Sequence, residues 1–109
     1  MTTFDDREAA YEARFVRDAE LEFMAQASRN KHLGFWAAAI MGMNAEEAVR
    51  YAKDIIRTDL QEGGEEAVVR KIGKDMGDLR NEARIRERMA EFLVEARKRA
   101  KAGDLVTLI

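Results

Sequence analysis

The sequence of 109 residues contains no cysteine, no proline and a single histidine. Without cysteine there are no disulfides, thiol nucleophiles or cysteine-ligated zinc sites. One histidine excludes the paired Glu-x-x-His motifs of a di-metal helical bundle, so we expect no metal. The absence of proline, with many residues that favour helices, predicts an all-helical protein.

Long apolar runs and an excess of positive charge are also missing. No stretch approaches the roughly 18 to 20 continuous apolar residues of a membrane-spanning helix, and the N-terminus does not have the pattern of a signal peptide. The formal net charge is −2, which gives no basic field to attract nucleic acid. We therefore expect a cytoplasmic protein with no nucleic-acid partner and no membrane insertion.

Catalytic motifs are scarce as well. Ser28 stands four residues before His32, so the two could share a helix face, but no third residue is marked as an orienting group. The pair Gly63-Gly64 lacks the following Lys and Ser or Thr of a phosphate-binding loop and predicts a simple break between helices. We expect no catalytic residue and no enzymatic activity.

What the sequence does contain is a helical pattern with short breaks. Capping residues and glycines predict four helices, from Thr3 to about Met41, from about Ala45 to Glu62, from Glu65 to before Gly77, and from Asp78 or Asn81 to Gly103. Short connectors favour an antiparallel or orthogonal four-helix bundle. The buried face of the second helix is predicted as Ala48, Val49, Ala52, Ile55, Ile56 and Leu60.

Three parts follow from this pattern. Residues 1–18 form a charged N-terminal segment, called the arm below, and residues 19–103 form the four-helix domain, called the bundle. Residues 104–109 are a mostly apolar tail that either folds back on the bundle or remains loose.

The arm carries aromatic residues at helical spacing. Phe4, Tyr11 and Phe15 are separated by seven and four residues, which places them on one face of a helix among charged neighbours. Two interpretations remain open. The stripe packs on the bundle, or the arm is a recognition helix that becomes ordered when it binds a partner.

A second candidate site lies further along the first helix. Arg29, Lys31 and Trp36 combine cations with an aromatic ring, the usual elements of a nucleotide site. The alternative is an ordinary helix surface. His32 is expected at the surface or its boundary, in a basic patch with Arg29 and Lys31.

Several motifs, in order, resemble a known family. They are Thr3-Phe4-Asp5-Asp6-Arg7-Glu8, Phe15 with Asp18, Arg29-Asn30-Lys31, Leu33-Gly34-Phe35-Trp36-Ala37-Ala38, Ala48 with Tyr51-Ala52-Lys53, Arg84-Ile85-Arg86 and Met89-Ala90-Glu91-Phe92. Together they resemble the zeta subunit, the inhibitor protein of alphaproteobacterial F-type ATP synthases, to about residue 100. Arg14, where the family is expected to have lysine, and Phe35, where leucine is usual, depart mildly from it.

The resemblance implies a four-helix fold whose mobile arm enters a catalytic interface between the alpha and beta subunits. There it would block the rotation that accompanies ATP hydrolysis and impede synthesis less. The implied partners are the alpha, beta and gamma subunits, which hold the protein at the inner membrane through the ATP synthase head, and the free protein is expected to be a monomer. Some members are associated with nucleotide binding, so ADP or ATP is a candidate ligand, although no cofactor is required.

Carried onto this sequence, the resemblance predicts a set of partner-binding residues in the arm. They are Phe4, Asp5, Asp6, Arg7, Glu8, Tyr11, Glu12 and Phe15. Aromatic anchors usually dominate the affinity of an interface, whereas charges set its register. The alternative functions are a small ADP- or ATP-binding module and a helical adaptor with another partner.

Overall fold

A computed structural model describes residues 3–105 of the chain, without the side chains of residues 3–9, 11, 12 and 15. Its elements are α1 (Thr3–Ile40), α2 (Ala45–Glu62), α3 (Glu65–Met76), the short 3-10 helix η1 (Gly77–Leu79) and α4 (Glu82–Lys101). No strand occurs in this part of the chain. The structure therefore confirms the predicted all-α, four-helix fold.

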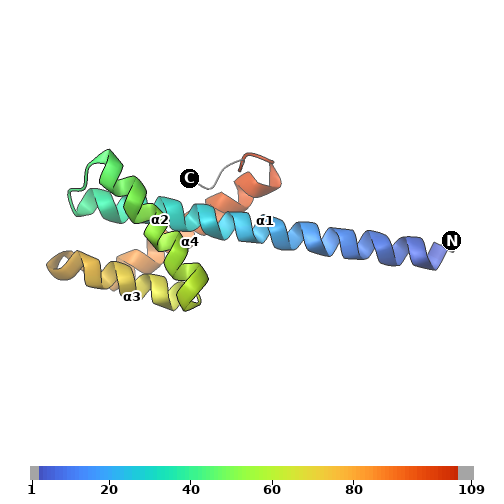
Figure 1. Cartoon of the computed structure of the whole chain (residues 1–109), viewed down its shortest axis with the longest axis horizontal. Helices are drawn as coiled ribbons and strands as arrows, with labels where there is room; N and C mark the ends of the chain where they lie inside the picture. Colours follow the sequence, from blue (N-terminus) through green and yellow to red (C-terminus); the bar gives the residue numbers. More distant parts are fainter. Residues whose placement is uncertain (1–2, 106–109) are drawn as a thin grey trace.

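Helix α1 is one unbroken rod of 38 residues. The sequence has no proline, and its first glycine is Gly34, so nothing interrupts the helix before it enters the bundle. Figure 1 shows α1 projecting far beyond the other helices at its N-terminal end, in a molecule of 63 × 24 × 22 Å. The prediction that arm and core segment share a single helix is confirmed.

The boundaries of the other helices follow from local capping. Asn44 and Glu47 exchange side-chain and backbone hydrogen bonds in a capping box at the start of α2. Gly63 ends α2 with a φ of 83°, a left-handed conformation that favours glycine. Of the two residues predicted to cap α4, it is Asn81 whose side chain accepts a hydrogen bond from the Arg84 amide.

The main core lies where all four helices meet. Each helix contributes at least one side chain that is fully excluded from water, namely Leu33 of α1, Ile55 of α2, Val68 and Ile72 of α3, and Ile85 of α4. Burial of each aliphatic side chain stabilises the fold by roughly 1.5 to 3 kcal/mol. This cluster involves only the C-terminal half of α1, so the arm contributes nothing to it.

A smaller cluster joins α1 to the end of α4. Ala25 of α1 packs with Ala96, Ala100 and Leu105, all of them buried. Of the two alternatives for the tail, folding back on the bundle or remaining loose, Leu105 therefore follows the first. Residues 106–109 lie outside the part of the chain that the structure describes.

One predicted core residue was placed wrongly. Leu60 was expected on the buried face of α2, but 60% of it is exposed. In Figure 1, α2 crosses α1 at an angle rather than running along it, so it can cover only part of the length of α1. The buried residues of α2 are Tyr51, Ala52, Ile55 and Thr58, and Leu60 lies at the edge of the face that they form.

None of the helices between residues 3 and 105 is sufficiently long and apolar to cross a membrane. The described side chains also include no cluster of three or more acidic or histidine residues suited to a metal ion.

Helices α1 and α2 approach most closely at Gly34. A Cβ atom added there would lie 2.7 Å from the Cα atom of Ala52, a distance at which the backbones must move apart. We predict that Gly34→Ala lowers the free energy of unfolding by about 1 to 3 kcal/mol, despite the higher helix propensity of alanine.

Gly73→Ala is the matched control for this substitution. Gly73 is also buried within a helix, but its added Cβ would meet only the side chain of Arg80, which can move. Its effect should be smaller than about 1 kcal/mol and in the stabilising direction. Urea denaturation of both variants tests the difference, and equal effects would contradict a tight α1–α2 contact.

Candidate functional site

The arm is the first candidate site, and the structure describes its backbone in more detail than its side chains. The side chains predicted to bind a partner all lie outside the described ones: Phe4, Asp5, Asp6, Arg7, Glu8, Tyr11, Glu12 and Phe15. Their role stays a prediction. The backbone from Thr3 onward is helical, and the described arm residues from Ala13 to Asp18 are all exposed.

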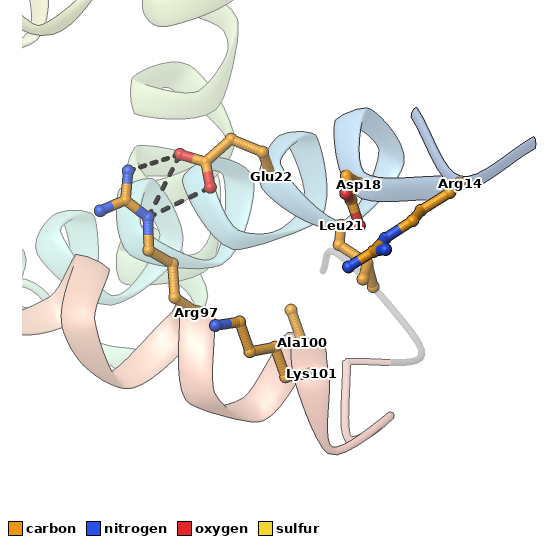
Figure 2. Close-up of a pocket in the computed structure, with 7 residues that line it drawn as sticks. All are labelled: Arg14, Asp18, Leu21, Glu22, Arg97, Ala100 and Lys101. Atoms are coloured by element: carbon orange, nitrogen blue, oxygen red, sulfur yellow. Dashed lines mark hydrogen bonds and ion pairs between the residues drawn. The ribbon is translucent and has the colours of Figure 1, made fainter. Parts of the chain in front are cut away.

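A charged cleft of about 480 Å³ marks the place where the arm leaves the bundle. Arg14, Asp18 and Leu21 of α1 line one side of it, and Ala100 and Lys101 at the end of α4 line the other (Figure 2). The cleft also contains an ion pair between these two helices, described next. This cleft is called the base cleft below.

Glu22 and Arg97 form that ion pair across the base cleft. The Arg97 Nη2 atom donates to Glu22 Oε1 at 2.6 Å, and Nε donates to Oε2 at 3.1 Å (Figure 2). These bonds from Arg97, with a further one from Gln26, lower the pKa of the Glu22 carboxyl below its ordinary value of 4.5, against a smaller opposing effect of burial. The pair fixes α4 to α1 directly below the arm.

The third notable group is a buried charge cluster around Arg29. Its Nη1 atom donates to Glu65 Oε1 at 2.9 Å, its Nε donates to Asn30 Oδ1 at 2.8 Å, and its Nη2 lies 3.7 Å from Asp59 Oδ2. Asn30 in turn donates to Asp59 at 2.8 Å. The cluster joins α1 to the end of α2 and the start of α3, on the two sides of the Gly63-Gly64 break.

The predicted surface position of Arg29 was wrong, because only 1% of this residue is exposed. The sequence contains a signal for the burial of Arg29. Arg29 lies four residues before Leu33 and seven before Trp36, which places it on the same helix face as core residues. A buried cation on that face needs carboxylate partners, which the largely buried Asp59 and the more exposed Glu65 provide.

The candidate nucleotide residues are only partly brought together. Arg29 and Trp36 share a face of α1, where Trp36 packs against the main core. Lys31 follows Arg29 by two residues, or about 200° of helical rotation, so it lies on the opposite side. A nucleotide site at Arg29, Lys31 and Trp36 stays a prediction, and the carboxylate partners of Arg29 do not favour it.

Ser28 and His32 share a helix face, as expected, but the hydrogen bond between them does not involve the serine hydroxyl. The His32 Nδ1 atom lies 2.9 Å from the Ser28 carbonyl oxygen. The Ser28 hydroxyl is buried without a hydrogen-bond partner. The half-buried His32 ring packs against Phe92 at a centroid distance of 5.9 Å, so its position at the surface boundary is confirmed.

The Arg29 cluster yields a prediction about stability. We expect Arg29→Met to lower the free energy of unfolding by about 2 to 4 kcal/mol, because it leaves Asp59 and Asn30 buried without their cation. The matched control is Arg57→Met, since Arg57 pairs with Asp54 on the exposed surface of α2. That variant should change the free energy by less than about 0.5 kcal/mol. Equal losses of unfolding free energy in urea denaturation would show that the Arg29 cluster stabilises the fold no more than a surface ion pair does.

The Glu22–Arg97 pair yields a prediction about pH. Because the pKa of Glu22 is lowered in the folded state, the pair stabilises the protein above the ordinary value of 4.5, and this stabilisation is lost as the pH falls through the folded-state pKa. Glu22→Gln should therefore be less stable than the wild type at neutral pH, and the difference should shrink below pH 4.5. Arg97→Gln should show the same pattern. A gap that stays constant between neutral and acidic pH would contradict this assignment.

Comparison with known proteins identifies the family. The family model described as ATPase inhibitor subunit zeta matches residues 1–99, which include the arm and nearly the whole bundle. Searches among curated proteins and among solved structures give no match. The match confirms the resemblance drawn from the motifs of the sequence. The chain belongs to the ATPase inhibitor subunit zeta family.

Proposed function

We propose that this protein inhibits ATP hydrolysis by the F-type ATP synthase, and that its arm does so by inserting as a helix between an alpha and a beta subunit. The family match supports the inhibitory role. The observation that supports the use of the arm is the geometry of α1, which leaves the bundle as a continuous helix and, beyond the base cleft, has no other described element beside it (Figure 1).

The length of the arm suits a wedge. Residues 3 to 18 of a helix span about 24 Å at 1.5 Å per residue. A helix this short is marginal in water when isolated, because its first turn is costly to form. Here the packed part of α1 acts as the nucleus, so the bundle lowers the free-energy cost of presenting the arm as a helix.

The bundle also sets the direction of the arm. Arg29 attaches α1 to α2 and α3, and Glu22 attaches it to α4, so the axis of α1 is fixed on several sides just below the arm. A partner that binds the arm then meets one orientation, which reduces the entropy lost on binding. The arm would act as the effector and residues 19–103 as its scaffold.

In this proposal the protein is a binding protein and not an enzyme. The alpha and beta subunits form the walls of the site, and the inserted helix opposes the movement of the gamma subunit during hydrolysis more than during synthesis. The protein would act in the cytoplasm, at the inner membrane surface through the ATP synthase head.

The proposal predicts that a break in the arm abolishes inhibition. Ala13 is exposed and lies in the middle of the arm, so Ala13→Pro should disrupt the helix at a cost of about 3 kcal/mol or more without touching the bundle. We expect inhibition of ATP hydrolysis by the purified head from the same organism to weaken about 100-fold or more. Removal of residues 1–18 should abolish it.

Ala13→Gln serves as the control, because glutamine keeps the helix and stays exposed, and it should inhibit like the wild type. Urea denaturation checks that the proline variant retains a stable bundle. Full inhibition by the proline variant would contradict the insertion of a helical arm. A wild-type protein that neither binds nor inhibits the head would contradict the proposed target.

A further inference from the structure

An apolar face of α1 is left uncovered directly where the arm joins the bundle. Val16 and Phe23 of α1 are 54% and 49% exposed, and Ala19 lies between them on the same face. The three residues line an open hollow of about 500 Å³ with Met24 and one charged residue, Glu20. Phe23 also lines a narrower hollow with Ile56 and Leu60 of α2, so the face continues onto the second helix. We call Val16, Ala19, Phe23 and Leu60 the base patch.

The base patch exists because α2 covers only part of one face of α1. Ala27 and Asn30, one and two turns after Phe23, lie on this face and are buried under α2. Before Phe23 the face passes beyond the end of α2, but the sequence keeps apolar residues at helical spacing. Single exposed apolar residues are common, whereas a contiguous apolar face built from two helices marks an interaction surface.

The base patch is too small to hold a partner alone. Its three large side chains, each about half covered already, offer on the order of 300 Å² of apolar surface. A stable interface buries about 800 Å² on each partner. A second copy of this chain held only by the base patch would therefore be unstable, and the patch must extend a larger interface.

Among the described parts of the chain, the arm is the adjoining surface that offers such an extension along the same helix. Helix α1 has no break between Thr3 and Ile40, so a partner that holds the arm along its length reaches Val16 and Phe23 without any gap. We propose that the base patch is a second contact with the ATPase, in which an apolar surface beside the site of arm insertion packs against Val16, Ala19, Phe23 and Leu60. This inference rests on the proposed function and adds a contact from the bundle to it.

The contact would also limit how far the arm enters. Leu60 lies on α2, to the side of α1, so it cannot follow the arm between two subunits. Once Leu60 and Phe23 touch the outer surface of the ATPase, the arm can enter no further. The length of α1 on the N-terminal side of Phe23 then determines which arm residues reach the interior.

Leu60 gives the sharpest test because it does not belong to the arm helix. In the full-length protein, Leu60→Gln should weaken inhibition of ATP hydrolysis about tenfold and leave the fold intact, since the side chain is exposed. Leu79→Gln is the matched control. Leu79 is 56% exposed, and it belongs to η1, which follows α3 at the end of the molecule opposite the N-terminus (Figure 1).

Neither substitution changes the charge of the protein. The tenfold difference in inhibition between the wild type and Leu60→Gln should therefore persist at high salt, as expected for an apolar contact and not for a charged one. Leu60→Gln inhibiting like the wild type would overturn the base patch as a contact and leave the arm mechanism intact. Equal losses for both leucine variants would overturn it as well. A concentration-dependent wild-type dimer that Leu60→Gln dissociates would assign the patch to a second copy instead. A wild type that does not bind the ATPase would overturn both proposals.

Discussion

The close packing of α1 on α2 at Gly34 is the contact on which the rest of the molecule depends. Helix α1 has to serve both as a core element and as a free rod, and only its C-terminal half can be secured by other helices. At Gly34 the absent side chain lets the Ala52 backbone come so close that a Cβ would lie 2.7 Å from it. Tight packing over a short length thus compensates for the exposed residues of α1 between Ala13 and Glu20 that the structure describes.

Apolar packing alone would keep α1 in the bundle but would not fix the orientation of its axis, because apolar contacts are largely non-directional. The buried guanidinium of Arg29 adds direction. Its planar group lies against Glu65 of α3 and Asp59 of α2, and Asn30 of α1 also donates to Asp59, so a rotation of α1 would disturb contacts with both neighbouring helices. The cluster lies about five turns from the middle of the arm, so a small change in the angle of α1 at Arg29 would displace the arm by a larger distance.

The course of the backbone could be predicted well from the sequence, because helix boundaries depend on local chemistry. The capping box at Asn44 and Glu47 and the glycines at 63 and 64 act within a few residues, and each marks a boundary of the structure. The position of Asn81 as the cap of α4 could be narrowed only to two candidates, since Asp78 has the same chemistry.

The environment of individual side chains was harder to predict, because it depends on how helices cross. Leu60 has the correct spacing for a core residue of α2, yet it lies at the edge of the face that α2 buries, one turn after the half-buried Ile56. Arg29 shows the opposite error, since its charge indicated a surface although its position indicated the core. Both errors arise from the crossing of α1 and α2, a tertiary feature that periodicity within one helix does not contain.

The two faces of α1 at the base of the arm differ in a way that suits a rod held on one side and used on the other. Toward α4 the surface is charged, and Glu22 and Arg97 satisfy each other within the protein. Toward the end of α2 the surface is apolar, and nothing among the described residues covers Val16 or Phe23. Charged groups exposed there would remain hydrated and would resist contact with a partner, whereas apolar groups gain free energy when a partner removes them from water. A helix that is secured through its polar side therefore keeps its apolar side exposed, and under the proposed function this asymmetry of the base would give the arm one preferred side from which a partner approaches.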